Sequence, residues 1–339
     1  MLKKILVSCA SLCAMLNGFG QKAEPIKSTT TITGYIDGYF RALTKDGGGT
    51  HNNFTSFTNS YNSFNLGMAS VKIDQTYGRF SSTLDIGVGK RVDEFSYNDK
   101  DLLTNIKQVT LSYSFSKNLK LTAGKFATHI GYELLDATSN RNYSMSYGFS
   151  YGPFFHTGIK ADISLGGKSA MMVGVVDPTD YSTFNSNPKY IIAQFSSASI
   201  NEKIKGYFNF LHGDITTQYN LVLSATLSSK ISAVFDGSIN QQKNPIGKSN
   251  WSSQAFYLNY DFSEKIGLTL REDFFNDRQN NPIGIGNLNA TTLSGKFKLN
   301  KLTLSPEFRI DNSTVPLFNT KTGTVSSASN FLVAAVYTF

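Results

Sequence analysis

The sequence predicts an all-β fold: a transmembrane, antiparallel, up-and-down β-barrel of about 16 strands, with short periplasmic turns and long external loops. Segments of alternating apolar and polar residues recur along the chain, and short and long connections alternate between them. The last strand ends on an aromatic residue, Phe339. Period-2 alternation is typical of strands, and aromatic girdles at both interfaces are typical of membrane barrels.

The first 20 residues are expected to form a cleaved signal peptide. Two lysines precede an apolar stretch at residues 5–16, and small residues follow it. Cleavage there leaves a mature chain that begins near Gln21. Residues 21–28 are then a short periplasmic segment, and residues 29–339 form the barrel.

Both cysteines, Cys9 and Cys13, lie in the predicted signal peptide, so the exported chain would have neither a disulfide nor a thiol ligand. The alternative is a lipoprotein processed at Cys9, although only residues 5–8 would precede that site as an apolar core. Export removes two lysines from 32 basic and 24 acidic residues, which leaves 30 against 24, or +6. This excess favours anionic solutes in a pore or contact with lipopolysaccharide, and an ordinary solvated surface is the alternative.

Five strands are predicted in the first third of the chain, each with one apolar and one polar face. In the first strand Ile32, Ile36 and Phe40 share one face, opposite Tyr35 and Arg41. The second strand changes phase after Met68, which predicts a β-bulge. These strands are predicted at residues 29–43, 63–75, 79–88, 105–115 and 119–126.

Four strands follow in the middle of the chain, and the alternation is weakest in the third of them, residues 189–197. The final third alternates most clearly, as where Phe256, Leu258 and Tyr260 oppose Tyr257 and Asn259. The middle strands are predicted at residues 155–165, 169–176, 189–197 and 203–211. The last seven are predicted at residues 216–227, 231–240, 251–262, 266–275, 289–299, 302–311 and 328–339.

The connections are of two kinds. A tight turn, such as residues 76–78, follows each even-numbered strand, whereas most odd-numbered strands are followed by long polar segments such as 44–62 and 127–154. Bacterial barrels have short periplasmic turns, long external loops and an even number of strands. A soluble β-sandwich or propeller is the alternative fold, but neither requires turn length to depend on strand parity.

Charges of both signs occur on the polar faces of these strands. Such side chains need water or opposite charges around them, and a barrel of about 16 strands leaves an aqueous lumen. We therefore expect them to line a wet channel. They are Asp37, Arg41, Arg79, Asp85, Lys120, Lys160, Asp162, Asp236, Arg271, Asp273, Glu307, Arg309 and Asp311.

The longest loop, residues 127–154, is the third external loop and a candidate constriction. It contains His129, Glu133, Asp136 and Arg141. We expect its acidic groups to face basic side chains on the barrel wall across a narrow aqueous gap, where opposed charges select solutes by size and charge. The alternative is a surface loop whose charges are solvated.

One part of the sequence resembles a known family. The run LTAGKFATHIGYE at residues 121–133, with NYS at 142–144 and GPFFHTG at 152–158, resembles the OmpL-like β-barrel porin family found in Bacteroidetes and related bacteria. The similarity extends from about Thr31 to Phe339. It implies an outer-membrane porin for passive diffusion of small hydrophilic solutes or ions, and it names no solute.

Two other classes of function stay open. A surface-exposed binding or adhesion barrel without transport would use polar loops such as residues 46–54 and 276–289. A barrel enzyme would need an imidazole base, for which His156 is the best candidate, but no nucleophile motif accompanies it and we expect no enzymatic activity. We also find no metal-ligand cluster, phosphate loop or nucleic-acid motif, so no cofactor and no nucleic acid are expected.

The expected location is the outer membrane of a Gram-negative bacterium. The expected partners are outer-membrane lipids, lipopolysaccharide, small polar solutes and the barrel assembly machinery, which would read the C-terminal strand ending at Phe339. The oligomeric state stays open, a homotrimer included.

Overall fold

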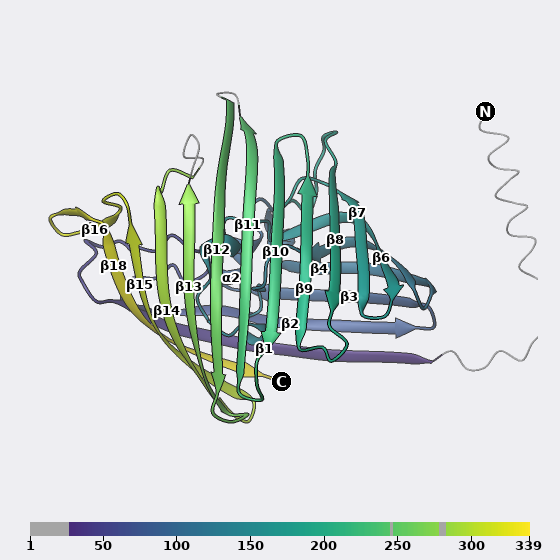
Figure 1. Cartoon of the computed structure of the whole chain (residues 1–339), viewed down its shortest axis with the longest axis horizontal. Helices are drawn as coiled ribbons and strands as arrows, with labels where there is room; N and C mark the ends of the chain where they lie inside the picture. The colour runs from purple at the N-terminus through teal and green to yellow at the C-terminus, as the bar shows by residue number, and fades with distance from the viewer. Residues whose placement is uncertain (1–26, 245–246, 278–282) are drawn as a thin grey trace, which may run out of the picture.

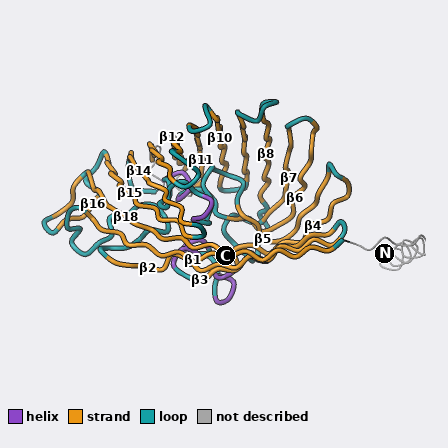
Figure 2. Tube along the Cα trace, turned by 90° about the horizontal axis from the view of Figure 1, so that it is seen from below, coloured by secondary structure: helices purple, strands orange, loops and turns teal. Residues whose placement is uncertain are grey.

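The computed structural model describes residues 27–244, 247–277 and 283–339, so the predicted signal peptide and residues 21–26 lie outside the described residues. Sixteen antiparallel strands close into one barrel. Each barrel strand pairs with the next along the chain, and the first pairs with the last. Figures 1 and 2 show the barrel in two views at right angles.

The barrel strands are β1 (Ser28–Leu43), β2 (Ser63–Tyr77), β3 (Phe80–Val88), β4 (Ile106–Ser116), β5 (Leu119–Ala127), β6 (Phe155–Gly166), β7 (Ser169–Val176), β8 (Tyr190–Ala198), β9 (Ile204–His212), β10 (Thr216–Thr226), β11 (Ile231–Asn244), β12 (Gly247–Asp261), β13 (Ile266–Asp277), β14 (Asn287–Leu299), β15 (Leu302–Ser313) and β18 (Ser327–Thr338). The other elements lie in long loops: α2 (Lys90–Phe95), η1 (Asp101–Asn105), η2 (Ala137–Ser139), α3 (Tyr147–Ser150) and the hairpin β16 (Phe318–Thr320) with β17 (Gly323–Val325). None of the helices in the described part of the chain has the length and apolarity needed to cross a bilayer.

The predicted sixteen-stranded antiparallel barrel is confirmed, and several of its predicted strand boundaries differ from the observed ones. Arg79 lies in the turn between β2 and β3 rather than in a strand. β11 and β12 remain paired as far as Asn244 and Gly247, so most of the predicted loop 241–250 is strand. The apolar alternation ends before the hydrogen-bonded ladder does, because residues above the apolar belt no longer need an apolar face.

A β-bulge interrupts β2 close to the position that the sequence predicts. The register between β1 and β2 shifts beside Asp37, where Gly67 is the extra residue. The Asp37 carboxylate accepts a hydrogen bond from the backbone N–H of Met68. The bulge turns Met68 and Ser70 toward the interior while Phe64 and Leu66 stay outside, so both halves of β2 keep an apolar outer face.

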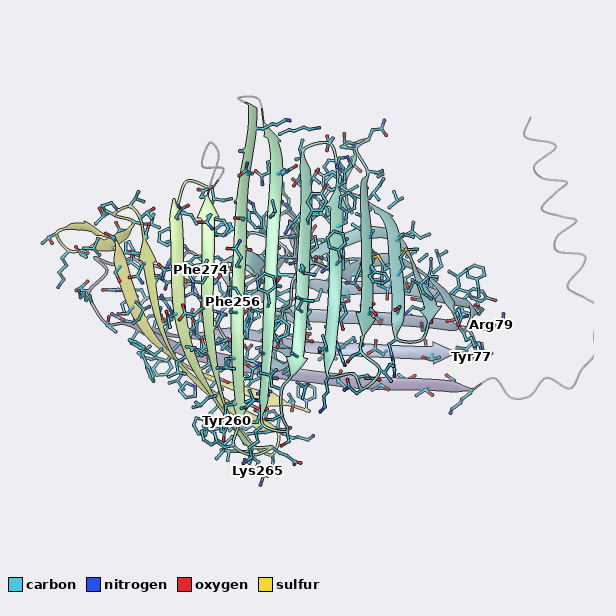
Figure 3. All side chains as sticks on the ribbon, viewed as in Figure 1. Tyr77, Arg79, Phe256, Tyr260, Lys265 and Phe274 are labelled. Carbon is cyan, nitrogen blue, oxygen red and sulfur yellow. The ribbon has the colours of Figure 1, made fainter. Side chains whose placement is uncertain are left out.

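The outer face of the barrel is apolar around its middle and aromatic near the short turns. In Figure 3 Phe256 and Phe274 lie at mid-height of β12 and β13, and Tyr260 and Lys265 lie close to the turn that joins these strands. The exposed aromatic side chains near the short-turn end include Tyr77, Phe80, Phe115, Tyr260, Phe262 and Tyr337. An apolar belt that ends in an aromatic girdle is the outer surface of a membrane barrel.

The barrel is closed by the C-terminal residue as well as by the β1–β18 ladder. The backbone N–H of Phe339 donates to Gly34 O at 3.0 Å, and Gly34 N–H donates back to Phe339 O at 3.3 Å. A Cβ at Gly34 would lie 2.4 Å from Cζ of the Phe339 ring and 2.6 Å from the backbone oxygen of Ser70 on β2, so the close approach of ring and backbone requires glycine here. Gly34 and the terminal phenylalanine therefore fit one another at the seam.

The apolar belt predicts a depth-dependent cost for a charge on the outer face. Leu221 lies near the middle of β10, where its register partners are Gly237 and Phe208. Leu221→Arg is expected to lower the free energy of unfolding in lipid vesicles by about 2–4 kcal/mol. Thr217→Arg, on the same face but near the long-loop end, is the control and should cost about 0–1 kcal/mol. Equal costs at the two positions would contradict the assignment of the belt.

Candidate functional site

The loop between β5 and β6, residues 128–154, enters the barrel and crosses the lumen; we call it the inserted loop. Figure 2 shows loop and helix segments inside the ring of strands. Near its start, His129 Nε2 lies 3.0 Å from Phe210 O on β9. Farther along, the hydroxyl of Tyr143 donates to Asp37 Oδ2 on β1 at 2.6 Å. The inserted loop thus contacts the wall on several sides.

Carboxylates of the wall accept hydrogen bonds from the backbone of the inserted loop. Tyr132 N–H donates to Asp236 Oδ2 at 2.9 Å, and Tyr147 N–H donates to Asp273 Oδ2 at 2.7 Å. The two oxygens of Glu307 accept from the N–H groups of Tyr143 and Ser144. A segment without regular structure cannot bond its own peptide groups, so these carboxylates provide the acceptors that it lacks.

Two arginines of the wall serve the carbonyl groups of the same segment. Arg271 Nη1 donates to Ser144 O at 2.7 Å, and its Nη2 donates to Met145 O at 3.1 Å. Arg309 Nη1 donates to Met145 O at 2.8 Å, and the guanidinium also pairs with Asp311. Because a guanidinium presents several donors in one plane, one side chain can hold consecutive carbonyls.

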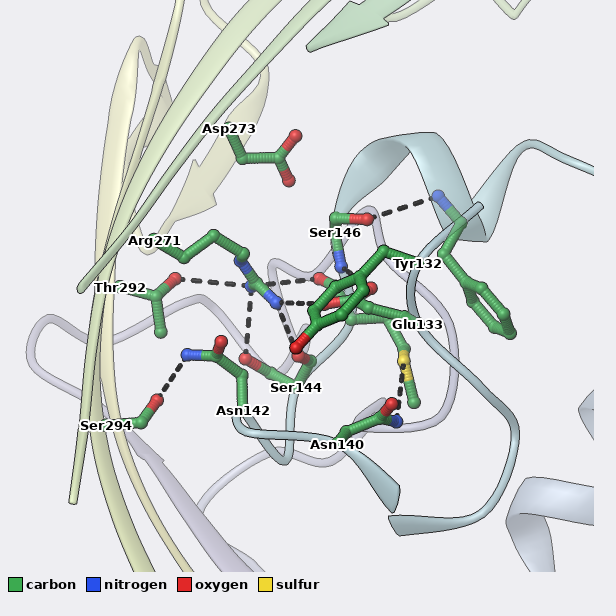
Figure 4. A network of polar contacts seen from close by, with 12 residues as sticks. Tyr132, Glu133, Asn140, Asn142, Ser144, Ser146, Arg271, Asp273, Thr292 and Ser294 are labelled. Carbon is green, nitrogen blue, oxygen red and sulfur yellow. Dashed lines mark hydrogen bonds and ion pairs between the residues drawn. The ribbon is translucent and has the colours of Figure 1, made fainter. Parts of the chain in front are cut away.

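Glu133 of the inserted loop contacts Arg271 directly. Figure 4 shows Glu133 and Ser146 beside the Arg271 guanidinium, with Asp273 close by on β13. The distance from Arg271 Nη1 to Glu133 Oε1 is 2.8 Å, and the two side chains are 0% and 2% exposed. Glu133 Oε2 also accepts from Ser146 N–H at 2.7 Å. The expected aqueous gap between these opposite charges is absent here, because the groups form a buried pair.

Asp136 and Arg141 also meet charges on the wall. Asp136 Oδ1 lies 2.5 Å from Lys107 Nζ on β4 and accepts from the Tyr35 hydroxyl at 3.0 Å. Arg141 pairs with both carboxylate oxygens of Asp261 at 2.6 and 2.8 Å. In this second pair the inserted loop supplies the cation and the wall supplies the anion. We expected the reverse arrangement, with acidic groups on the loop and basic groups on the wall.

The remaining predicted residues lie in three kinds of surroundings. Arg41 donates to His51 O and Ser60 O, and therefore holds the loop between β1 and β2. Lys160 lies 3.0 Å and Lys120 4.0 Å from Asp162, and all three remain partly exposed toward the short-turn end. Arg79 donates to Phe115 O from its turn. Of the predicted lumen lining, Lys120, Lys160 and Asp162 near the short turns and Asp136 of the inserted loop keep partly exposed side chains, whereas residues such as Arg271, Glu307 and Arg309 are buried.

Sequence reasoning missed several residues that hold the loops. Arg91 in α2 is fully buried, with its guanidinium 4.7 Å from the Tyr143 ring and 5.2 Å from the Phe57 ring. Lys107 was missed because it lies at a register shift between β3 and β4, where the alternation of inward and outward side chains along β4 changes phase. The six residues of α2 are too few to show helical periodicity, so no sequence signal could have found Arg91.

Asp180, in the loop between β7 and β8, holds the end of the inserted loop. Its Oδ1 accepts from the N–H groups of Phe154 and Phe155 at 2.7 and 3.0 Å, and its Oδ2 accepts from the Tyr97 hydroxyl at 3.1 Å. Burial raises the pKa of Asp180 to about 7, although these hydrogen bonds act against the increase. The carboxyl group therefore titrates near neutral pH.

Cavities open at both ends of the barrel. At the long-loop end, a cavity of about 1000 Å³ is lined by Tyr97, Tyr151, Tyr190, Gln218 and Asn240, among others. At the short-turn end, cavities of about 590 and 540 Å³ lie near Lys120 and Arg141. Across residues 27–244, 247–277 and 283–339, no group of three His, Cys, Asp or Glu side chains is placed to hold a metal ion.

The sequence model of a family described as "Putative beta-barrel porin-2, OmpL-like" matches residues 29–339. No sequence match was found among curated proteins. The fold is similar to that of the outer membrane channel DcaP of Acinetobacter baumannii, with a TM-score of 0.63 and 12% identity over 96% of this chain and 100% of that one.

Two further solved structures share the fold. OmpT of Vibrio cholerae has a TM-score of 0.60 and 12% identity over 94% of this chain and 99% of that one. OccK11 (OpdR) of Pseudomonas aeruginosa has a TM-score of 0.55 and 9% identity over 95% and 99%. At such identities the likeness concerns the fold alone.

The buried pair predicts that Glu133 and Arg271 depend on each other. Arg271→Met leaves a buried carboxylate without its cation, and it should destabilise the arrangement of the inserted loop by about 3–5 kcal/mol. Limited proteolysis within residues 128–154 measures this, while heat-dependent migration on gels reports whether the barrel stays intact. The double variant Glu133→Gln with Arg271→Met should recover much of the resistance. Equal resistance in all three proteins would show that the pair does not hold the loop.

The raised pKa of Asp180 predicts that the stability of the folded protein depends on pH. An unfolded aspartate has a pKa near 3.9, so between about pH 4 and 7 the folded protein keeps a proton that the unfolded chain has lost. Stability should therefore fall as the pH rises through this window, by at most about 1.4 kcal/mol per pH unit. Urea unfolding in vesicles at pH 5.5 and 8.5 measures the loss, and Asp180→Asn should reduce it. A variant with the pH dependence of the wild type would refute this assignment.

Proposed function

The chain belongs to the OmpL-like beta-barrel porin family, and on that premise we propose how its barrel serves passive diffusion of small hydrophilic solutes. The proposal rests on the family match over nearly the whole barrel, together with a closed sixteen-stranded wall that has cavities at both ends. A barrel of this size has room for a solute path beside internal loops. The family and the fold place it in an outer membrane.

We propose that the short turns face the periplasm and that the long loops face outward, as in bacterial barrels generally. Export would depend on the signal peptide predicted at residues 1–20. Assembly would depend on recognition of the terminal strand by the barrel assembly machinery, and the packing of Phe339 against Gly34 supports a role for this residue in closing the barrel. Association into a homotrimer stays a prediction.

The inserted loop is proposed to be the constriction of the channel. Its support is the set of contacts that carry it across the lumen, including the pairs Glu133–Arg271 and Asp136–Lys107. These charges would act by fixing the position of the loop rather than by facing a solute, because the first pair is buried.

One cavity at the short-turn end, which we call the periplasmic cavity, supports a preference for anions. Three basic side chains, Arg79, Lys117 and Lys120, line the cavity of about 590 Å³, together with one acidic side chain, Asp162. An excess of positive charge at a narrow mouth raises the local concentration of anions. The +6 charge of the predicted mature chain is in keeping with this preference.

A binding barrel without transport is the second candidate, because the inserted loop fills so much of the lumen. One polar loop that could bind a partner is residues 276–289. Its residues 278–282 lie outside the described part of the chain. A catalytic barrel is a weaker proposal, since His156 is fully buried and lies 3.4 Å from the hydroxyl of Thr128, where no substrate has access.

Planar-bilayer recording tests the channel and its charge preference. The wild type should give discrete conductance steps in KCl, with chloride more permeant than potassium. Neutralising Arg79, Lys117 and Lys120 to Gln should move the reversal potential in a salt gradient toward zero. Lys168→Gln is the matched control, because Lys168 lies in another short turn, pairs with Glu202 and does not line this cavity. A folded barrel that never conducts would favour the binding alternative.

A further inference from the structure

The cavities at the two ends approach each other along β8. Tyr190 lines the cavity at the long-loop end, and Gln194 lines the cavity of about 590 Å³ at the short-turn end. These residues are four positions apart, or roughly 13 Å along a strand. The inward-facing residue between them is Ile192, which is 0% exposed. On this side of the barrel, a thin layer of protein separates the two cavities.

The layer is apolar. Its side chains form one buried cluster, which we call the apolar layer: Phe126, Ile130, Met172, Val176, Tyr190, Ile192 and Leu211. Tyr190 and Leu211 line the cavity at the long-loop end, which we call the outer cavity. Met172 lines the periplasmic cavity, so the layer borders both. Six of its members come from the wall strands β5, β7, β8 and β9, and Ile130 comes from the inserted loop.

Elsewhere in the lumen the apolar clusters are packed against buried charges: Arg91 lies over the rings of Phe57 and Tyr143, and Arg309 lies over the ring of Tyr147. Opening a passage through them would separate buried pairs such as Glu133–Arg271, which costs several kcal/mol. In the apolar layer, opening requires apolar side chains to move apart, and the hydrogen bonds beside it, such as Gln194 Nε2 to His129 O at 3.3 Å, join uncharged groups. Ile130 is tied at its N–H to the Thr128 hydroxyl at 3.1 Å, and no charged side chain belongs to the cluster. The least costly route therefore crosses the apolar layer.

The two faces of the layer differ in charge, because two acidic and two basic side chains, Glu94, Asp180, Lys90 and Lys243, line the cavity at the long-loop end, whereas three basic and one acidic line the other cavity. Lys160 Nζ lies 5.5 Å from the Phe126 ring on the periplasmic side, and Lys117 and Lys120 lie in the adjoining cavity. A hydrated inorganic ion would lose its water in an apolar constriction, whereas a solute with an apolar body can replace water contacts with contacts to the layer. Cations beyond the layer would attract a solute that also carries a negative group.

We propose that solutes cross this barrel through the apolar layer, and that the layer selects small organic anions with an apolar body over hydrated inorganic ions. The proposal rests on the proposed function as a channel and names its route and its class of solute. Ile192 and Ile130 determine the specificity, because both belong to the apolar layer, one on the wall and one on the inserted loop.

Planar-bilayer recordings with two sulfonates test the class of solute. Benzenesulfonate and isethionate carry the same charge, but only the first has an apolar body. Reversal potentials under bi-ionic conditions with chloride give their permeability ratios. The wild type should favour benzenesulfonate over isethionate on the order of tenfold, although benzenesulfonate is larger. A preference for the smaller, hydroxylated anion would overturn the proposal.

A pair of variants tests the route. Ile192→Ser places a hydroxyl in the layer, and it should raise KCl conductance severalfold and abolish the preference between the sulfonates. Ile191→Ser is the matched control, because Ile191 is the next residue of β8 but faces outward and is 53% exposed; it should leave both readouts unchanged. If conductance and preference are the same in Ile192→Ser and the wild type, the route lies elsewhere and the proposal fails while the channel function stands.

A second pair keeps the test valid if Ile192→Ser does not fold. Ile130→Ser changes the layer from the inserted loop, and Leu134→Ser, at an exposed position of the same loop, is its control. The expected result is again a larger KCl conductance in Ile130→Ser alone. If the wild type and all variants form folded barrels without any conductance, the proposed function fails, and the route fails with it.

Discussion

A chain segment inside a barrel has to bond its peptide groups, and this requirement determines the interior of the protein. The inserted loop contains only the short elements η2 and α3, so most of its N–H and C=O groups need partners from elsewhere. The wall supplies these partners as Asp236, Asp273 and Glu307 for the N–H groups, and as Arg271 and Arg309 for the carbonyls. The charges inside the barrel are therefore structural to a large extent.

This use of charge divides the lumen into two parts. Where the loop is bonded to Arg271, Glu307 and Arg309, the interior is packed and these charges are shielded from water. Beside β7, β8 and β9 the loop meets the wall through apolar side chains such as Ile130 and Ile192, and there the cavities from the two ends come within a few residues of each other. The bonded part fixes the position of the loop, and the apolar part leaves a boundary that can open at low cost.

The sequence predicted the wall far better than its contents. Period-2 alternation places Arg271 and Asp273 on the inner face of β13 because that pattern is local. Their partners in the inserted loop follow from contacts between segments more than 100 residues apart, and no periodic signal records these. Local irregularities account for other differences, since Arg79 falls in a turn and Lys107 lies beside a register shift. The role of Glu133 and Asp136 in permeation stays a prediction.

Amide hydrogen exchange of the wild-type barrel in lipid vesicles, followed for Tyr132, Ser144 and Tyr147, tests most directly whether the inserted loop is bonded to the wall inside the lumen. If the wall carboxylates bind these N–H groups, their exchange should be as slow as that of amides in the barrel strands β12 to β14. Exchange as fast as at Thr322, in the exposed turn between β16 and β17, would show that the loop does not occupy the lumen. That result would contradict the account of the interior and of the route beside it.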